Sequence, residues 1–463
     1  MSQGASPEGD LEPVASTDTG DNWAPTRALS RAVLVAGLLL VAAVLLGRTD
    51  LVILAAPLAL SVAFALAKRP RTLPGLRLST VESFPVEGGD LGATVEVENR
   101  DVTGYDLTVV HLQHSPWLRL EGGAVDPGAG RRGRGGNRPY VTLVPRGVAT
   151  AVELAGPAVR WGRHWLGPAS AHAVAADGLL VSRAVVTGAL GVKVYPLTDP
   201  FKADEAMPRA AGLVGQHRSR RPGEGGELAG VRQFGPGDRL RRVDWRVSLR
   251  TERLHVAATL SDRDAEVVVL LDLLADAGRS GGIGGASSVL DRSVRAAAAI
   301  AEHYLHRGDR VSVLEYGAQA RRLRPASGRR QYLTVLEWLL DAHPSPTAQE
   351  RGGAQLAAGI SAAALVVVLT PLLDARSASM LAGLARSGRF VVAVDTLPSD
   401  LTSPPVNTWS DVSYRLWKAE RENTMGQLGE HGVPVVAWAG AGSLDAVLRD
   451  VSRLAAAPKA VLR

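Results

Sequence analysis

The spacing of hydrophobic and polar positions changes three times along the chain, and each change predicts a different kind of structure. Residues 28–67 are apolar almost throughout and are interrupted only by the polar turn GRTD at residues 47–50. From about residue 76 to residue 194, apolar and polar residues alternate in short segments separated by Gly and Pro. Beyond residue 265, continuous apolar runs alternate with segments of helical spacing. The pattern predicts several domains, which the length of 463 residues also favours.

Each half of the apolar region 28–67 is about twenty residues long, which matches a helix that crosses roughly 30 Å of hydrocarbon. We therefore expect two transmembrane helices joined by the polar turn. Two alternatives are a cleaved signal peptide and a buried helical hairpin. A signal peptide fits poorly because a long polar segment comes first and a second apolar run follows. That segment, residues 1–27, is acidic and rich in Ser, Gly and Pro, so we expect a disordered cytoplasmic tail.

Basic residues flank the outer ends of the two predicted helices: Arg27, Arg31, Lys68, Arg69 and Arg71. The connecting turn carries only Arg48, which Asp50 balances. Because basic flanks are retained in the cytoplasm, both ends of the chain are expected there. The sequence thus predicts a multi-pass protein of the inner (plasma) membrane with most of the chain in the cytoplasm.

Short alternating segments such as ATVEVENR (93–100) and LTVVHL (107–112) predict strands, and their frequent turn signals predict a β-sandwich domain over residues 70–195. One loop in this region, PGAGRRGRGGNRP at residues 127–139, has the composition of RNA-binding segments. A single loop of this length is more often the tip of a hairpin, so we expect no nucleic-acid partner.

The apolar runs EVVVLLDLL (266–274) and AALVVVLTPLLD (363–374) predict strands that are buried on both faces, and the segment 289–308 has helical spacing. Such alternation predicts a doubly wound, mostly parallel α/β sheet over residues 263–463. Ligands of these sheets bind at the carboxyl ends of the strands. A site is therefore expected near three polar residues that end or follow strands: Asp272, Thr370 and Asp395.

A connector over residues 196–262 contains the stretch GPGDRLRRVDWRVSLRTERLHV (235–256), which has neither clean helical nor clean strand spacing. One interpretation is a structural connector with solvated charges. The other is a clasp between domains and a surface for a partner, in which Trp245 is a buried anchor. The residues assigned to this motif are Gly235, Pro236, Gly237, Asp238, Arg241, Arg242, Asp244, Trp245 and Arg250.

Composition narrows the classes of function. The net charge of +6 is modest for this length, and the preference for Arg, Ala and Gly is typical of a GC-rich bacterial genome. The chain has no Cys, which excludes disulfides and thiolate metal sites. The sequence also lacks the patterns G-x-x-x-x-G-K-[ST], H-E-x-x-H and G-x-S-x-G. We expect a protein that is not an enzyme and binds no cofactor; the alternative is a hydrolase that uses acidic residues at the carboxyl edge of the α/β sheet.

The run at residues 226–256, followed by a strand that ends in Asp272, resembles the signature of the bacterial family called domain of unknown function 58. The upstream segments RWGRHWLGP (160–168), DGLL (177–180) and VYP (194–196) are similar to that family in their order. The resemblance implies two membrane helices, a β-sandwich and a von Willebrand factor A-like domain. It also implies a protein-interaction or scaffold role together with a MoxR-type AAA+ ATPase, in the assembly or remodelling of a partner.

A von Willebrand factor A-like domain commonly holds Mg²⁺ through a D-x-S-x-S loop after its first strand. The corresponding loop here, residues 272–276, keeps the leading Asp272 but lacks both serines. Asp276 and Asp374 are the candidates for substitute oxygens. Because Mg²⁺ requires nearly complete octahedral oxygen coordination, we expect no tight divalent site and partner binding that is independent of metal.

Overall fold

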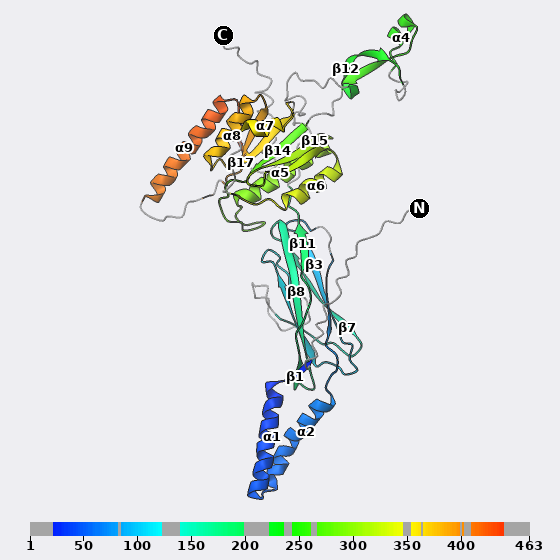
Figure 1. Cartoon of the computed structure of the whole chain (residues 1–463), viewed down its shortest axis with the longest axis vertical. Coiled ribbons are helices and arrows are strands. Elements are labelled where there is room, and N and C mark those ends of the chain that lie inside the picture. The colour runs from blue at the N-terminus through cyan, green and yellow to red at the C-terminus, as the bar shows by residue number, and fades with distance from the viewer. Residues whose placement is uncertain are drawn as a thin grey trace. The chain divides into compact units, whose positions relative to one another are not determined.

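The computed structural model describes residues 22–81, 85–122, 139–198, 222–235, 243–260, 266–345, 353–362, 364–398, 401 and 409–438. The chain divides into two compact units, Met1–Tyr195 and Pro196–Arg463 (Figure 1).

Unit 1 contains two long apolar helices, α1 (Arg27–Leu46) and α2 (Asp50–Ala67). Gly47 has a φ of 59° and ends α1, because the left-handed conformation at this position favours Gly. Both helices are long and apolar enough to cross a membrane, yet only 17% and 11% of their most apolar windows are buried. A helix in the core of a soluble protein is mostly buried, so the exposure of these helices disfavours the buried-hairpin alternative.

A short strand precedes the helices and corrects one expectation. Residues Trp23–Pro25 form β1, which pairs with β9 (Leu180–Ser182), and the Trp23 side chain is only 2% exposed. The prediction of disorder over residues 1–27 is therefore wrong for its last part, because burial of a large indole offsets the entropy of ordering a short segment. The other part, residues 1–21, lies outside the described residues.

The rest of unit 1 consists of two antiparallel sheets. One has the order β1-β9-β8-β4-β6, with β10 and β11 also paired to β8, and the other has the order β2-β3-β7-β5. The strands not yet given are β2 (Gly75–Thr80), β3 (Asp90–Glu98), β4 (Leu107–His114), β5 (Glu121–Gly122), β6 (Tyr140–Thr142), β7 (Ala149–Pro157), β8 (Gly162–Ala175), β10 (Val185–Val186) and β11 (Leu190–Val194).

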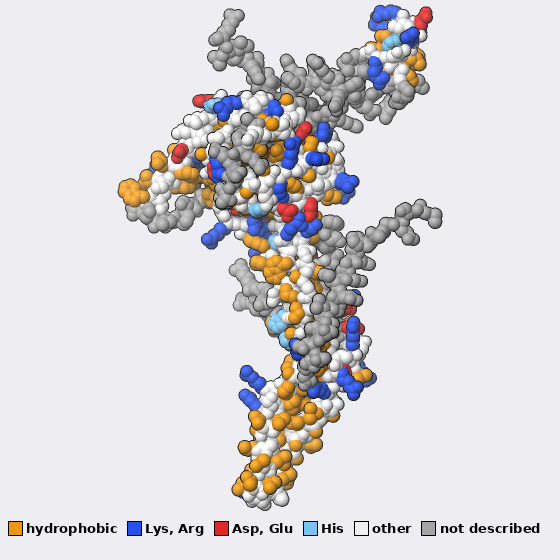
Figure 2. All heavy atoms as spheres, in the orientation of Figure 1, with side chains coloured by type: hydrophobic (Ala, Val, Ile, Leu, Met, Phe, Trp, Pro, Cys, Tyr) orange, Lys and Arg blue, Asp and Glu red, His pale blue; other side chains and the backbone are white. Residues whose placement is uncertain are grey.

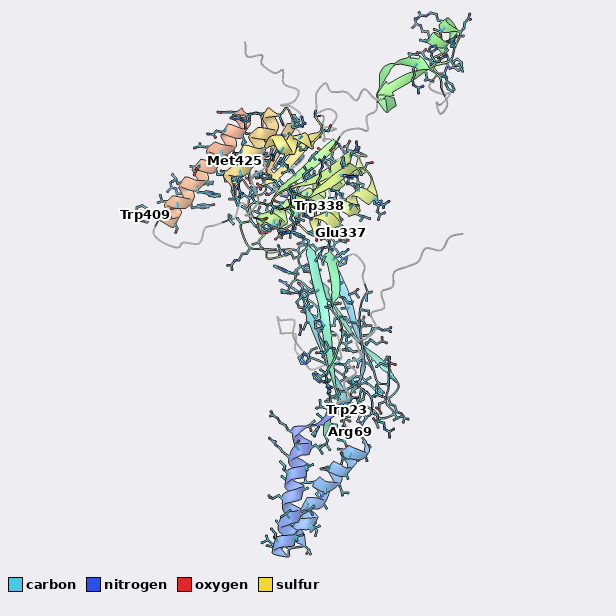
Figure 3. All side chains as sticks on the ribbon, in the orientation of Figure 1. Trp23, Arg69, Glu337, Trp338, Trp409 and Met425 are labelled. Atoms are coloured by element: carbon cyan, nitrogen blue, oxygen red, sulfur yellow. The ribbon has the colours of Figure 1, made fainter. Side chains whose placement is uncertain are left out.

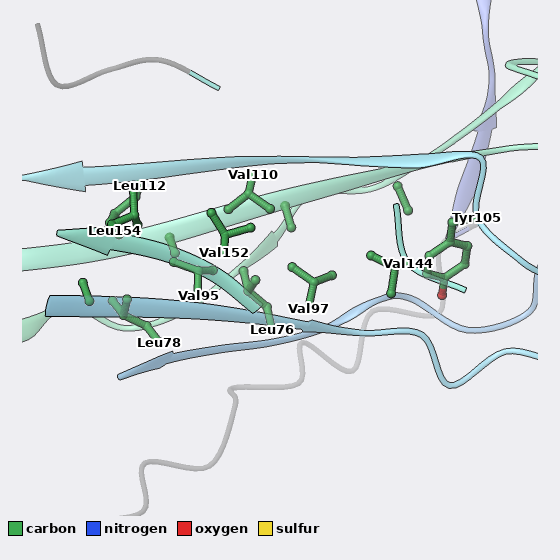
Figure 4. Close-up of a cluster of buried hydrophobic side chains, with 14 of the residues drawn as sticks. Leu76, Leu78, Val95, Val97, Tyr105, Val110, Leu112, Val144, Val152 and Leu154 are labelled. Atoms are coloured by element: carbon green, nitrogen blue, oxygen red, sulfur yellow. The ribbon is translucent and has the colours of Figure 1, made fainter. Parts of the chain in front are cut away.

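Period-two patterning builds the core between these sheets. Along β3 every second side chain is buried, including Val95 and Val97. They share one hydrophobic cluster with Val110 and Leu112 of β4, in the other sheet (Figure 4). Alternate residues of a strand point to opposite faces, so the alternation in the sequence decides which side chains enter this core. The Gly/Arg loop at residues 127–139, except for Pro139, lies outside the described residues.

Unit 2 starts with a two-stranded antiparallel sheet formed by β12 (Pro222–Gln233) and β13 (His255–Leu260). The short helix α4 (Trp245–Thr251) precedes β13. These elements contain the described part of the Arg-rich stretch that the sequence singles out.

The larger part of unit 2 is a six-stranded sheet with the order β16-β15-β14-β17-β18-β19 (Figure 1). Its strands are β14 (Glu266–Asp272), β15 (Arg310–Tyr316), β16 (Arg322–Ala326), β17 (Leu365–Thr370), β18 (Phe390–Asp395) and β19 (Val435–Ala437). All pair in parallel except the edge strand β16, which pairs antiparallel with β15.

Helices flank this sheet. They are α5 (Val289–His306), α6 (Arg329–Leu339), α7 (Gly353–Ala358), α8 (Ala375–Arg386) and α9 (Ser410–Glu430). Met380 and Leu381 of α8 share a hydrophobic cluster with Val268 and Leu270 of β14. The sequence pattern did not indicate β16, α7 or α8.

Candidate functional site

Hydrogen bonds at the start of helix α4, and one from β13 to Ser248, hold this helix in place. Asp244 is its N-cap, and the Asp244 carboxylate accepts hydrogen bonds from the backbone N–H groups of Arg246 and Val247, both at 3.1 Å. The buried Ser248 hydroxyl donates to the backbone carbonyl of Asp244 at 2.7 Å and accepts from the N–H of His255 at 2.9 Å. Asp244, expected to contact a partner or another domain, therefore holds the start of α4.

Two large apolar side chains of α4 face solvent. Trp245 is 62% exposed and Leu249 is 80% exposed. Residues four apart lie on the same face of a helix, so the two side chains form one apolar surface. The expectation that Trp245 is buried is wrong, because α4 buries the small Ser248 against β13 and turns the indole outward. Arg246, Arg250 and Arg253 are exposed in the same segment. We call Trp245, Leu249 and these three arginines the α4 surface.

The other members of the motif are only partly described. Gly235 follows β12 and lies within the described residues, whereas Pro236, Gly237, Asp238, Arg241 and Arg242 lie outside them. The tight turn and the arginines assigned to these positions stay a prediction.

The strand order of the α/β sheet marks a second candidate site. From β14 the chain proceeds to β15 and β16 on one side, and from β17 it proceeds to β18 and β19 on the other. The order reverses between β14 and β17, and ligands of open α/β sheets bind at the carboxyl ends of the strands at such a point. Asp272 ends β14 and Thr370 ends β17.

Asp272 is buried at this point and is bonded entirely within the protein. Its Oδ2 accepts hydrogen bonds from the hydroxyls of Thr370 and Ser377, both at 2.6 Å, and its Oδ1 accepts one from the N–H of Leu274 at 3.2 Å. Burial raises the pKa of Asp272, although these three hydrogen bonds oppose the rise. Thr370 and Ser377 are fully buried, so this cluster of oxygens is closed to solvent.

The other acidic candidates also have partners inside unit 2. Asp276 accepts a hydrogen bond from the N–H of Leu290, in the first turn of α5, at 3.0 Å. Asp374 is paired with Arg376 at 2.6 Å, and the hydrogen bond from this Arg lowers the pKa of Asp374. Both residues are thus engaged in local structure rather than aimed at Asp272.

Arg421 of α9 crosses the carboxyl edge of the sheet. Its guanidinium is 2.6 Å from Oδ1 of Asp395 and donates to the carbonyl oxygen of Pro371 at 2.9 and 3.1 Å. The side chains of Arg421 and Asp395 are 10% and 14% exposed. Leu372, next to Pro371, has a φ of 51°, a conformation rare for a residue other than Gly. Arg421 thus supplies positive charge at the carboxyl edge of the sheet and holds the strained loop at Pro371 and Leu372.

This donor set does not fit a Mg²⁺ ion. The two hydroxyls donate to Asp272, and Arg376 and Arg421 neutralise the neighbouring carboxylates. Among the residues that the structure describes, no group of three His, Cys, Asp or Glu side chains is placed to hold one metal ion. Partner binding without metal stays a prediction.

A cavity of about 280 Å³ lies beside the Gly-rich loop 280–288 and the side chains of Arg292 and Arg295. Arg292 donates to the carbonyl oxygens of Leu397 and Trp438, both at 2.6 Å, and thereby ties α5 to the segments that follow β18 and β19. Arg295 donates to the hydroxyl of Ser287 at 3.1 Å. These contacts give both arginines a structural role in unit 2.

Three residues of the two sites were missed by sequence reasoning. Leu249 stands four positions after Trp245, and this spacing alone indicates a shared helical face. Ser377 belongs to α8, which the sequence pattern did not reveal, and Arg421 lies in a helix whose register against the sheet is decided by tertiary packing.

Comparison with solved structures gives only weak likenesses. A cohesin module from a family 33 glycoside hydrolase of Clostridium perfringens matches 27% of this chain and 100% of its own length, at 13% identity and a TM-score of 0.20. A type I cohesin from Pseudobacteroides cellulosolvens matches 28% of this chain and 97% of its own length, at 14% identity and a TM-score of 0.18.

Sequence relatives are closer. Uncharacterized proteins of Mycobacterium tuberculosis and Mycobacterium bovis are each 34% identical to this chain over 137 residues. The match spans 29% of this chain and 42% of the length of each relative. Residues 230–406, which include α4 and the carboxyl edge of the sheet at Asp272 and Thr370, match the family described as protein of unknown function DUF58.

Proposed function

We propose that this protein is a membrane-anchored protein-interaction or scaffold protein whose cytoplasmic part recruits a partner through the α4 surface. In this proposal α1 and α2 span the inner membrane, the two antiparallel sheets form a β-sandwich, and the α/β part of unit 2 is a von Willebrand factor A-like domain. The observation that carries it is the exposure of Trp245 and Leu249 side by side on a capped helix.

The chemistry of the α4 surface supports a protein partner with an apolar pocket and acidic residues around it. Trp and Arg are the residue types enriched among those that dominate the energy of protein interfaces. An indole and a leucine side chain fit an apolar pocket, and the surrounding Arg246, Arg250 and Arg253 favour a rim of carboxylates on the partner. We propose a MoxR-type AAA+ ATPase as this partner and the assembly or remodelling of further proteins as the process.

The helices α1 and α2 support membrane anchoring. They have 20 and 18 residues, enough for about 30 Å of hydrocarbon, and their large apolar side chains, such as Leu34 and Leu45, are 72% and 78% exposed. In water these side chains would form an unfavourable surface, whereas lipid chains cover them without cost. Because basic flanks favour retention in the cytoplasm, the proposal has both ends of the chain on the cytoplasmic side.

The carboxyl edge of the α/β sheet suits a structural role better than catalysis. A general acid or base must reach a substrate proton, whereas Asp272 is enclosed with Thr370 and Ser377. We therefore propose a function without catalysis and without a cofactor, and we assign the edge to the stability of unit 2.

The orientation predicts the behaviour of reporter fusions. We expect alkaline carbonate to leave the full chain in the membrane fraction, because two spanning helices are held by lipid. A cytoplasm-active reporter fused after Arg463 is expected to be active, and one inserted between Arg48 and Thr49 is expected to be active only as a periplasmic reporter. Periplasmic activity of the C-terminal fusion would contradict both the orientation and the ATPase proposal.

The α4 surface predicts a loss of partner affinity. We expect Trp245→Ala and Leu249→Ala each to weaken binding of the full chain to the purified MoxR-type ATPase of the same organism by about tenfold, because each removes an interface anchor. Binding is measured by biolayer interferometry with the protein in nanodiscs, with and without EDTA.

The matched control is Trp409→Ala, which removes another exposed tryptophan of unit 2 (70% exposed) that lies at the start of α9 (Figure 3). Affinity is expected to stay unchanged in this variant. Equal affinity in wild type and in both α4 variants would refute the proposed surface, and loss of binding in EDTA would refute its independence from metal.

A further inference from the structure

Three exposed apolar side chains stand together at one end of the sheets of unit 1. Val102 is 83% exposed, Leu143 is 69% exposed and Val148 is 46% exposed. They belong to two loops that Asn99 joins. The backbone N–H of Asn99 donates to the carbonyl oxygen of Val148 at 3.1 Å, and the side-chain amide of Asn99 donates to the carbonyl oxygen of Val144 at 3.4 Å. We call Val102, Leu143 and Val148 the apolar rim.

The apolar rim lies at the end of the sheets from which α2 emerges. The Asp101 carboxylate accepts hydrogen bonds from the backbone N–H groups of Arg71 and Thr72, at 2.6 and 2.8 Å. Arg71 follows the last residue of α2, Ala67, by one helical turn of sequence. Val102 is the neighbour of Asp101, so the rim is close to the point where α2 leaves the membrane.

This junction is held firmly. Burial raises the pKa of Asp101, but hydrogen bonds from the backbone of Thr72, Thr103 and Arg71 outweigh burial and hold the pKa far below its usual value. Asp101 therefore stays ionised and keeps these bonds at neutral pH. On the side of α1, Arg69 donates to the carbonyl oxygen of Trp23 at 3.1 Å (Figure 3). The segments before α1 and after α2 are thus both fixed to the sheets.

Exposed basic residues lie at the same end of unit 1 as the rim. The exposed basic residues at this end are Arg27, Arg31, Lys68, Arg71, Arg100 and Arg146. Among them Arg100 is paired with Glu98 at 2.7 Å. Figure 2 shows Lys and Arg side chains gathered where the orange apolar surface of α1 and α2 meets the sheets. Apolar side chains among Lys and Arg are typical of surfaces that enter the headgroup layer of an anionic bilayer.

We propose that the apolar rim is a second membrane contact: Val102, Leu143 and Val148 enter the headgroup layer of the anionic leaflet, and the basic residues around them bind lipid phosphates. The proposal rests on the proposed function, since the bilayer lies at this end only if α1 and α2 span it. The sheets of unit 1 then stand on the membrane surface rather than moving freely beside it.

The absence of Cys from the chain allows a direct test. Val102→Cys in the full chain is labelled with the fluorophore NBD, and the protein is reconstituted in vesicles of equal parts phosphatidylcholine and phosphatidylglycerol. Quenching by aqueous iodide and by lipid carrying a nitroxide near its headgroup is then measured. We expect iodide quenching about threefold weaker than at an exposed control position, strong quenching by the nitroxide lipid, and more iodide quenching in vesicles of phosphatidylcholine alone.

The matched control is Val81→Cys. Val81 is also a highly exposed valine of unit 1, at 74%, but it follows the far end of β2. Because β2 starts at Gly75 beside the helices, its length places Val81 about 20 Å farther from them. The control has the same orientation in the vesicles, so it corrects for protein that faces the lumen. It is expected to be quenched by iodide and not by the nitroxide lipid.

The outcomes separate the two proposals. Release of the unlabelled full chain by alkaline carbonate would overturn the proposed function. Retention of the chain with equal iodide quenching at positions 102 and 81 would overturn the apolar rim alone. Protection from iodide without quenching by the nitroxide lipid would also overturn it, because a protein surface, such as a second copy of this chain, would then cover the rim.

Discussion

Trp23→Ala is expected to destabilise unit 1 by about 4 kcal/mol, the usual cost of truncating a fully buried tryptophan. The indole is 2% exposed and packs against Tyr105 with ring centroids 5.6 Å apart. Its Nε1 donates to the carbonyl oxygen of Thr72 at 3.2 Å. Alanine would leave a cavity between the sheets and would leave the carbonyl of Thr72 without this donor.

Differential scanning calorimetry of the full chain in detergent measures the effect. We expect the transition of unit 1 to fall by roughly 10 °C, given its size. Trp165→Ala is the matched control, because Trp165 belongs to the same sheets but is 45% exposed; its cost is expected to be about 1 kcal/mol. Trp23→Phe keeps most of the packing and isolates the hydrogen bond. Equal melting of Trp23→Ala and wild type would show that β1 does not stabilise the sheets.

Asp272→Ala is expected to destabilise the α/β part of unit 2 by about 3 kcal/mol. The substitution leaves the fully buried hydroxyls of Thr370 and Ser377 and the N–H of Leu274 without their acceptor, and each stranded donor carries a cost of desolvation. Amide hydrogen exchange of the peptides that contain β14 and β17 measures the change in opening free energy. Asp374→Ala, which removes the N-cap of α8 and a partly exposed ion pair with Arg376, is expected to cost only about 1 kcal/mol.

The raised pKa of Asp272 gives this prediction a dependence on pH. In the unfolded chain the carboxyl ionises near pH 4, whereas burial raises the pKa in the folded protein. The stabilisation that goes with the protonated form is complete below the unfolded pKa and is lost as the pH rises through the folded pKa. Wild type is therefore expected to lose stability relative to Asp272→Asn as the pH rises above about 4. Parallel behaviour of the two proteins from acid to neutral pH would contradict this assignment.

The sequence predicts those elements whose own residues carry a clear pattern of apolar and polar positions. Residues 267–271 of β14 and 365–369 of β17 are apolar at every position, and the segment of α5 has helical spacing with a Ser288 cap. By contrast, β16 at the sheet edge consists of exposed and partly exposed residues and has no buried face to mark it. The buried face of α8, Ser377, Met380, Leu381 and Leu384, does have helical spacing, but two of its four residues lie within a segment rich in Ala and Ser that hides it. The strand β1 was hidden because a segment of three residues has no period at all.

The residues of the candidate sites likewise divide into those that the local sequence pattern predicts and those that only tertiary packing places. Asp272 and Thr370 end recognisable strands, so their proximity could be predicted from the rule for parallel sheets. Their third partner, Ser377, and the Arg421 that crosses to Asp395 come from helices whose rotation is fixed only by packing. The exposure of Trp245 could not be read from its residue type, because a tryptophan serves equally as a core anchor and as an interface anchor.

The pairing of β1 with β9 also sets an order of events during synthesis. Trp23 and its partner Ser182 stand at opposite ends of the sequence of unit 1, with both apolar helices between them. At translation rates of about 5 to 20 residues per second, the ribosome makes β9 about 8 to 30 seconds after β1. The helices consequently leave the ribosome while β1 has no partner strand. The Trp23 segment therefore stays unpaired until β9 has been made, and β1 joins the sheet late in the folding of unit 1.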